Sequence, residues 1–270
     1  MQRTPVLFIS HGAPTFALEP GRLGPQLVAT GETLPRPKAV LVVSPHWITP
    51  GVRVATTPAP STVHDFGGFD RALYRIQYPA PGHPALAQRT VDVLRAAGWH
   101  AEADAGQGLD HGAWVPVRFL YPEADVPVFQ VSLPATLDAK QAYALGQALA
   151  PLRDEGVLIV GSGSMTHNLY EFRMSGDGHE AQYAREFADW VREAVEARDD
   201  ARLVDTLAIA PHARRAHPTP EHFLPLLVAA GAAARENEVE ALEGGITYGV
   251  LSMDSYLFGA RITAPAGELH

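Results

Sequence analysis

Two short apolar runs, each followed by a turn that carries a histidine, most constrain how this chain can fold. Residues 6–10 lead into His11-Gly-Ala-Pro, and residues 39–43 lead into Ser-Pro-His46-Trp. Continuous apolar runs of this length, bounded by glycine and proline, are typical of strands buried on both faces of a sheet. In such sheets the polar chemistry collects just beyond the carboxyl ends of the strands. We therefore expect His11 and His46 to lie at one edge of a sheet, as candidate metal ligands.

A third apolar run, residues 157–160, reaches His167 through a loop of glycine and serine. A single histidine after a strand is more often a satisfied polar residue than a ligand, but three at three strand ends favour a shared site. Glu221 directly precedes another histidine, so a carboxylate is also available there. The further candidate histidines are His64, His111, His217 and His222.

Strands and helices alternate along the rest of the chain. Thr219 is expected to cap a late helix with Pro220 at its first position, which places His222 in the first turn. The alternation predicts one catalytic α/β domain spanning residues 1–270, with a mainly parallel central sheet flanked by helices and a metal site at the carboxyl ends of the strands. The other expected elements are strands at 51–57, 126–133 and 246–258, and helices at 84–98, 138–153 and 180–197.

The composition limits the functions open to the chain. A net charge of -9 argues against nucleic acid as a partner, because no basic stripe is available to neutralise phosphates. The sequence predicts neither a membrane span nor a signal peptide. Cysteine is absent, which excludes thiolate sites and favours a cytoplasmic protein. Any metal must be held by His, Asp or Glu, a ligand set that suits zinc, Fe(II) or Mn(II), and three such ligands would leave positions open for catalysis.

Six motifs, taken together, resemble those of the class III extradiol ring-cleaving dioxygenases, and in particular the branch named for 4,5-DOPA dioxygenase. One such motif alone would be a weak signal, but the series follows the family's order and extends over most of the chain. The motifs are Ser10-His-Gly-Ala-Pro14, Ser44-Pro-His-Trp47, His64-Asp-Phe-Gly-Gly-Phe69, Asp110-His-Gly-Ala-Trp114, His167-Asn-Leu169 and Pro218-Thr-Pro-Glu-His-Phe-Leu-Pro-Leu-Leu227.

The resemblance implies a function and a division of roles. The reaction would be extradiol cleavage of a small catecholic substrate with O2, giving a semialdehyde. Fe(II) is the expected cofactor, and zinc is possible as the bound metal. Some relatives use a glutamate as third ligand, so Glu221 stays an alternative, and a contribution from His217 is left open. The metal ligands would be His11, His46 and His222. His167 would be the catalytic acid/base, with His111 as a second histidine in the pocket. Phe66 and Phe69 would form an aromatic wall for the substrate.

Two other readings remain open from the sequence. A zinc-dependent hydrolase could use the same three ligands, with His167 activating water. A non-catalytic metal-binding relative is disfavoured, because all five of the histidines that the resemblance assigns to metal binding or catalysis are present. The identity of the catechol, the physiological metal and the oligomeric state are not fixed by these motifs.

Overall fold

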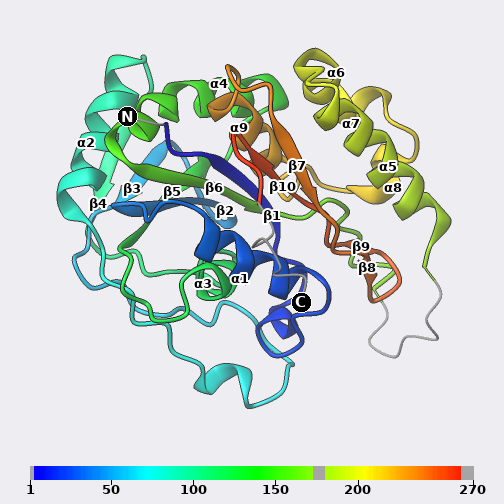
Figure 1. The fold of residues 1–270 in the computed structure, drawn as a ribbon, viewed down its shortest axis with the longest axis horizontal. Helices are drawn as coiled ribbons and strands as arrows, with labels where there is room; N and C mark the ends of the chain where they lie inside the picture. Colours follow the sequence, from blue (N-terminus) through cyan, green and yellow to red (C-terminus); the bar gives the residue numbers. More distant parts are fainter. Residues whose placement is uncertain (1–2, 173–179, 263–270) are drawn as a thin grey trace, which may run out of the picture.

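One sheet organises the computed structural model, which describes residues 3–172 and 180–262. Eight described strands form it, in the spatial order β4-β3-β5-β2-β6-β1-β10-β7 (Figure 1). The strands that carry the predicted site lie at its centre. The bounds are β1 Val6–Ser10, β2 Ala39–Thr49, β3 Val52–Ala55, β4 Ala101–Asp104, β5 Val128–Pro134, β6 Val157–Gly163, β7 Val239–Leu242 and β10 Ser255–Phe258.

The middle of the sheet is parallel, as the sequence predicted. Strands β5, β2, β6 and β1 pair in parallel, and so do β3 and β4. Strand β3 is antiparallel to β5, and β10 is antiparallel to both β1 and β7. Because β1, β2 and β6 run in the same direction, the residues at their carboxyl ends reach the same edge of the sheet.

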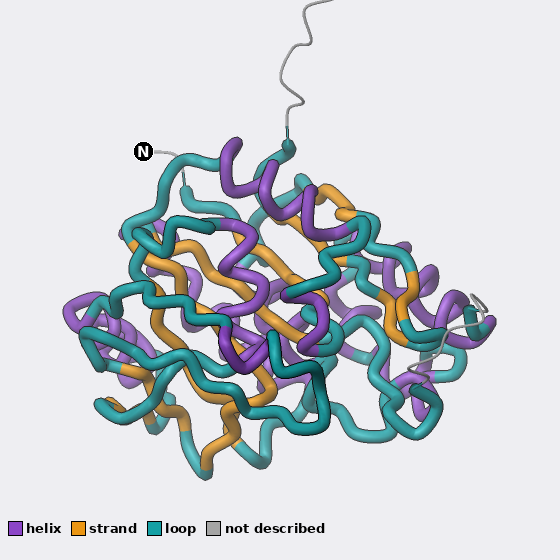
Figure 2. Tube along the Cα trace, turned by 90° about the horizontal axis from the view of Figure 1, so that it is seen from below, coloured by secondary structure: helices purple, strands orange, loops and turns teal. Residues whose placement is uncertain are grey.

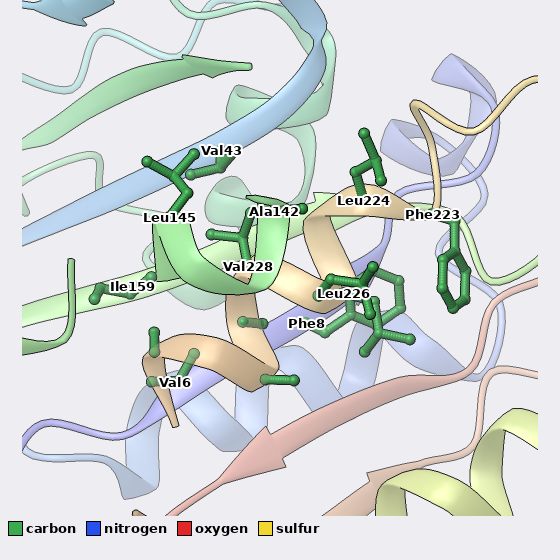
Figure 3. Packing of buried hydrophobic residues seen from close by; sticks show 14 of the residues in the cluster. Val6, Phe8, Val43, Ala142, Leu145, Ile159, Phe223, Leu224, Leu226 and Val228 are labelled. Atoms are coloured by element: carbon green, nitrogen blue, oxygen red, sulfur yellow. The ribbon is translucent and has the colours of Figure 1, made fainter. Parts of the chain in front are cut away.

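Helices cover both faces, which explains why the central strands are apolar throughout. In β1, Val6 and Phe8 pack into one hydrophobic cluster (Figure 3), while Leu7 and Ile9 pack into the other on the opposite face. Figure 2 shows helices and loops lying across the strands when the molecule is seen from below. The first cluster contains residues of α2 (Pro84–Ala96), α4 (Ala139–Leu149), α5 (Gln182–Glu196) and α9 (Leu224–Ala232), and the second contains residues of α1 (Leu23–Thr33) and α3 (His111–Leu120).

Smaller elements complete the described part of the chain. No helix in this part combines the length and apolarity that crossing a membrane requires. The short helices are η1 (Pro14–Ala17), η2 (Leu73–Arg75), η3 (Ala150–Glu155), α6 (Asp200–Val204), α7 (Thr206–Ile209) and α8 (Ala213–Ala216), and a separate two-stranded sheet joins β8 (Ile246–Thr247) to β9 (Leu251–Ser252).

The expected start of the last helix was wrong. Regular helix begins at Leu224, so His222 lies in the turn before α9 and not in its first turn. The N–H groups of Phe223 and Leu224 close a turn on the Pro220 carbonyl, but Pro225 has no N–H to bond the carbonyl of Glu221, so the next helical bond is missing and the regular helix begins only at Leu224. Thr219 does not cap the helix, because its hydroxyl donates to the Glu221 carboxyl group instead.

Two strand boundaries also differ from expectation. Strand β2 continues to Thr49 through a register shift between Val43 and Ile48, so His46 lies within an irregular part of the strand and not after it. Residues 246–258, expected to form one or two strands, form three short ones, and β4 and β7 were not predicted. Both of these short strands are partly exposed and carry acidic residues, which hides the apolar pattern of a strand.

Helices α4 and α9 pack closely through two glycines. A Cβ on Gly146 would collide with the Val228 carbonyl group, and one on Gly231 would collide with that of Tyr143. The close approach therefore requires the absence of a side chain at both positions.

Gly146→Ala is expected to lower the free energy of unfolding by about 1–3 kcal/mol, because the added methyl group pushes the two helices apart. Urea unfolding would measure the change. Gly67→Ala is the matched control, since a Cβ there meets nothing within 4 Å, and it should stay within about 0.5 kcal/mol of the parent. Equal stability of the two variants would contradict the close helix contact.

Candidate active site

His11, His46 and His222 meet at the carboxyl edge of the sheet. One nitrogen from each ring lies within 4.8 Å of the others, and the Nε2 atoms of His11 and His46 are 3.1 Å apart. His11 directly follows β1, where Gly12 adopts a φ of +60° and turns the chain away. The fold thus brings together three predicted ligands from segments far apart in the sequence.

Outer hydrogen bonds orient these rings. His11 Nδ1 lies 2.9 Å from Ser162 Oγ. The Ser162 hydroxyl donates its own hydrogen bond to the carbonyl oxygen of Gly112. Ser162 must therefore accept from His11 Nδ1–H, which leaves a lone pair on Nε2. His222 Nδ1 lies 3.2 Å from Glu221 Oε1, and its buried Nε2 has no hydrogen-bond partner among the described residues. Partners of this kind are what orient histidines that bind metals.

A buried polar network fixes the backbone on the other side of the site. Ser44 Oγ donates to Asp110 Oδ1 at 2.8 Å and accepts the N–H of His46 at 3.2 Å. Gln130 donates to the second oxygen of Asp110 at 2.7 Å, and Asp110 also caps α3. Since His111 is the first residue of α3, the network sets the positions of both His46 and His111.

His167 lies flat against His222. The ring centroids are 3.4 Å apart, and the planes differ by 7°. The His167 N–H donates to the Ala216 carbonyl at 2.8 Å, and the Ser164 N–H donates to the His222 carbonyl at 2.9 Å. The loop after β6 is therefore held against the turn before α9, and His167 reaches the site through the strand end that the sequence indicated.

Asp65 is a residue at the site that the sequence reasoning missed. Its Oδ2 lies 3.0 Å from His111 Nδ1 and 3.6 Å from His46 Nδ1, and its Oδ1 accepts the His111 N–H at 2.9 Å. The contact with His111 Nδ1 is an ion-pair distance and not a well-aligned hydrogen bond. The available signal was a lone carboxylate beside phenylalanines in a long loop of residues 58–78.

His217 and His64 point elsewhere. His217 Nε2 donates to the Met165 carbonyl at 2.9 Å, and its ring packs against Phe223. His64 Nε2 donates to the carbonyl of Ile76 at 2.9 Å, which braces the long loop. Both side chains hold segments around the site, and neither faces the nitrogens gathered in it.

A pocket of about 280 Å³ lies against the histidine cluster. Phe66 stands edge-on to His111, with ring centroids 5.6 Å apart, and Phe69 lies beside it. The loop of residues 58–78 thus contributes two aromatic side chains to the wall of the pocket, as the sequence predicted. The described lining consists of Gly12, Ala13, Pro14, His46, Phe66, Phe69, His111, His167, Leu169, Phe172, His222 and Leu251.

Burial keeps the imidazoles neutral. It lowers the pKa of His46 to about 3 and that of His167 to about 4, and it holds the pKa of His11 and His222 well below the usual range. Burial alone would raise the pKa of Asp65, but its contacts with His111 outweigh that effect, so the pKa is lowered. Neutral rings keep the lone pairs that metal binding or proton acceptance requires.

His217 allows this neutral state to be tested by pH. Burial lowers its pKa from 6.5 to about 4, so between these values the unfolded chain takes up a proton that the folded chain does not. The free energy of unfolding should therefore be unaffected by His217 above pH 6.5. As the pH falls toward 4, protonation of His217 in the unfolded chain should lower this free energy by on the order of 3 kcal/mol. His217→Asn keeps an amide donor for Met165 but does not titrate.

Urea unfolding of the metal-free protein at pH 7.5 and pH 4.5 would compare the two chains. The difference in unfolding free energy between the two pH values should be smaller in His217→Asn than in the parent. The same pH dependence in both would show that His217 is not held neutral.

Comparison with known proteins agrees with this geometry. The family model described as the catalytic LigB subunit of aromatic ring-opening dioxygenase matches residues 25–259. A "4,5-DOPA dioxygenase extradiol" from Beta vulgaris is 42% identical over 255 residues, which cover 93% of this chain and 95% of that protein. One of the same name from Escherichia coli (strain K12) is 39% identical over 259 residues, covering 95% of each.

The fold has a solved counterpart. A crystal structure of an uncharacterized protein from Escherichia coli K12 matches with a TM-score of 0.77 at 34% identity, covering 94% of this chain and 99% of that one. The family model alone spans far more than half of the chain, and the motifs predicted the same class. The chain therefore belongs to the LigB family of aromatic ring-opening dioxygenases, and it is an enzyme of the extradiol class.

Proposed function

We propose that this enzyme opens the ring of a small catechol beside its two hydroxyl groups, using O2 and a metal ion held by His11, His46 and His222. The observation that carries the proposal is the set of three neutral imidazoles with nitrogens within 4.8 Å of one another, beside an apolar pocket. The names of the relatives from Beta vulgaris and Escherichia coli support a catecholic substrate. They give no support to a zinc-dependent hydrolase.

The three histidines fit a divalent metal. The buried Nε2 of His222 lacks a partner in the described structure, and the hydrogen bond of His11 to Ser162 leaves a lone pair on the His11 Nε2, which lies 3.1 Å from Nε2 of His46. We expect Fe(II) as the working metal, with zinc able to occupy the same ligands. When bound, Fe(II) would supply open coordination positions and redox chemistry toward O2. Zinc on the same ligands would also have open positions, but it has no redox chemistry.

The remaining histidines would move protons. His167 is neutral at pH 7 because burial lowers its pKa to about 4, so its ring can accept a catechol hydroxyl proton and later return it to the opened product. His111, whose Nδ1 faces Asp65, would present Nε2 to the substrate from the other side. Phe66, Phe69 and Leu169 would hold the aromatic ring and keep water out.

The protein's other partners follow from the same proposal. The substrates would be one small catechol and O2, and the net charge of -9 argues against nucleic acid as a partner. A cytoplasmic location stays a prediction from the absence of cysteine.

The activity itself is tested by loading metal-free enzyme with Fe(II) under anaerobic conditions, adding a panel of catechols and admitting air. Oxygen uptake together with a yellow semialdehyde is the expected result. Ester or amide hydrolysis by the zinc form, with no oxygen uptake for any catechol, would favour the hydrolase instead.

Two substitutions separate the proposed roles. His222→Ala should lose bound metal, because it removes one of three ligands. His167→Ala should retain metal but lose at least 100-fold in kcat, in line with the usual contribution of a general acid or base. Metal content by elemental analysis and kcat by oxygen uptake are the measurements. Loss of metal from His167→Ala would overturn this division of roles.

Asp65→Asn tests the carboxylate beside His111. Asparagine keeps an oxygen for the His111 N–H and removes only the negative charge that faces the two rings. We expect kcat to fall about 10–100-fold with metal content retained, as for other groups that orient histidines at metal sites. Asp70→Asn is the matched control and should resemble the parent enzyme, because the Asp70 carboxylate accepts the Ala72 N–H within its own loop. Parental kcat in Asp65→Asn would exclude the role.

A further inference from the structure

A second cavity, of about 300 Å³, adjoins the histidine pocket and has no part in the proposed reaction. Ala13 lines both cavities, while its neighbours divide: Pro14 lines the histidine pocket and Thr15 lines the second cavity. Met253 of the second cavity also lies against Gly12 of the histidine pocket, because a Cβ on that glycine would fall 2.6 Å from the Met253 Sδ. A substituent that extends past Ala13 from a bound ring therefore has a further cavity to enter.

Tyr248 links the two cavities. It lines the second cavity, and its ring packs against Phe172 of the histidine pocket with centroids 4.7 Å apart. Its hydroxyl lies 2.5 Å from Thr15 Oγ1 and donates to Glu19 Oε2 at 3.5 Å. The backbone of Tyr248 adopts a φ of +51°, a conformation that costs a residue with a side chain free energy. The contacts of the ring offset this cost, and they hold the Glu19 carboxylate at the second cavity.

Two side chains of opposite charge line the second cavity. Glu19 and Arg22 are both exposed, and they lie three positions apart in the segment between η1 and α1. Within residues 3–172 and 180–262, the Arg22 guanidinium has no ion pair and donates no hydrogen bond. A guanidinium matches a carboxylate through two parallel hydrogen bonds, and a carboxylate accepts from an ammonium group. The pair therefore suits a ligand that carries both charges close together, as an α-amino acid does.

We propose that the second cavity receives an α-amino acid substituent on the catechol, with Arg22 binding its carboxylate and Glu19 its ammonium group. The inference rests on the proposed ring-opening function and names residues that determine its specificity. A divalent ion on the pocket histidines would attract a carboxylate and repel an ammonium group, so the ion alone favours an anion over a zwitterion. Glu19 supplies the negative partner that the ammonium group needs, and both contacts replace hydration that the zwitterion loses in the cavity.

Four catechols separate the two contacts in the Fe(II)-loaded full chain. 3,4-Dihydroxyphenylalanine carries both charges, dopamine only the ammonium group, 3-(3,4-dihydroxyphenyl)propanoate only the carboxylate, and 4-ethylcatechol neither. Arg22→Gln should lower kcat/KM for the two carboxylates, relative to 4-ethylcatechol, by about threefold to tenfold. Glu19→Gln should do the same for the two ammonium compounds. The charge of the metal is the same in parent and variants, so it cancels when their ratios are compared.

Two exposed charges outside both cavities provide matched controls. Lys140→Gln, in α4, removes one positive charge, and Glu123→Gln removes one negative charge. Both variants should keep the parental ratios of kcat/KM. Parental ratios in Arg22→Gln or in Glu19→Gln overturn this proposal and leave the ring-opening function standing. No turnover of any of the four catechols overturns the function and this proposal together.

Binding to the zinc-loaded chain tests the same contacts without turnover, because zinc has no redox chemistry. Calorimetry would measure the Kd of 3,4-dihydroxyphenylalanine and of 4-ethylcatechol. The amino acid should bind more tightly to the parent, and Arg22→Gln and Glu19→Gln should each reduce this preference by about threefold or more. Lys140→Gln and Glu123→Gln should keep it. Equal affinity of the parent for the two compounds, no binding of the amino acid, or an unchanged preference in either cavity variant overturns the proposal.

Discussion

The hydrogen bond between His11 and Ser162 is the interaction on which the site depends. It joins the end of β1 to the neighbouring strand β6, and the Ser162 hydroxyl in turn donates a hydrogen bond to the carbonyl oxygen of Gly112 in α3. Three segments are thereby tied to one ring nitrogen. Without the serine, nothing else described at Nδ1 would decide which ring nitrogen carries the proton, and the Nε2 lone pair toward His46 would no longer be assured.

That orientation matters because the histidines are buried where charge is costly. Desolvation holds the pKa of His46 near 3 and of His167 near 4, so the rings approach one another as neutral groups. Three imidazoles with nitrogens within 4.8 Å would repel strongly if protonated. The sheet therefore builds a site that presents lone pairs at neutral pH, which is the state in which imidazole binds a divalent ion.

Periodicity in the sequence was enough to place His11, His46 and His167 at one sheet edge, because strands buried on both faces leave a plain apolar signature. It could not place His222, since that position depends on Pro225 delaying the start of α9 and on packing against β6. The sequence patterns also did not identify Asp65, because its place at the site depends on a loop that folds back over α3. The contact joins Asp65 to His111, which lies 46 positions later in the sequence. Local patterns identify strands, whereas ligands on turns depend on tertiary contacts.

The site is consequently a property of the folded chain alone. The Ser164 N–H donates to the His222 carbonyl and the His167 N–H donates to the Ala216 carbonyl, so the position of His222 is fixed by contacts that span about 50 residues. In the unfolded chain the three histidines that we propose as metal ligands are dispersed over more than 200 positions and would bind a metal poorly. A metal that selects the folded state stabilises it by mass action, so ligand geometry and global stability are coupled through the same few hydrogen bonds.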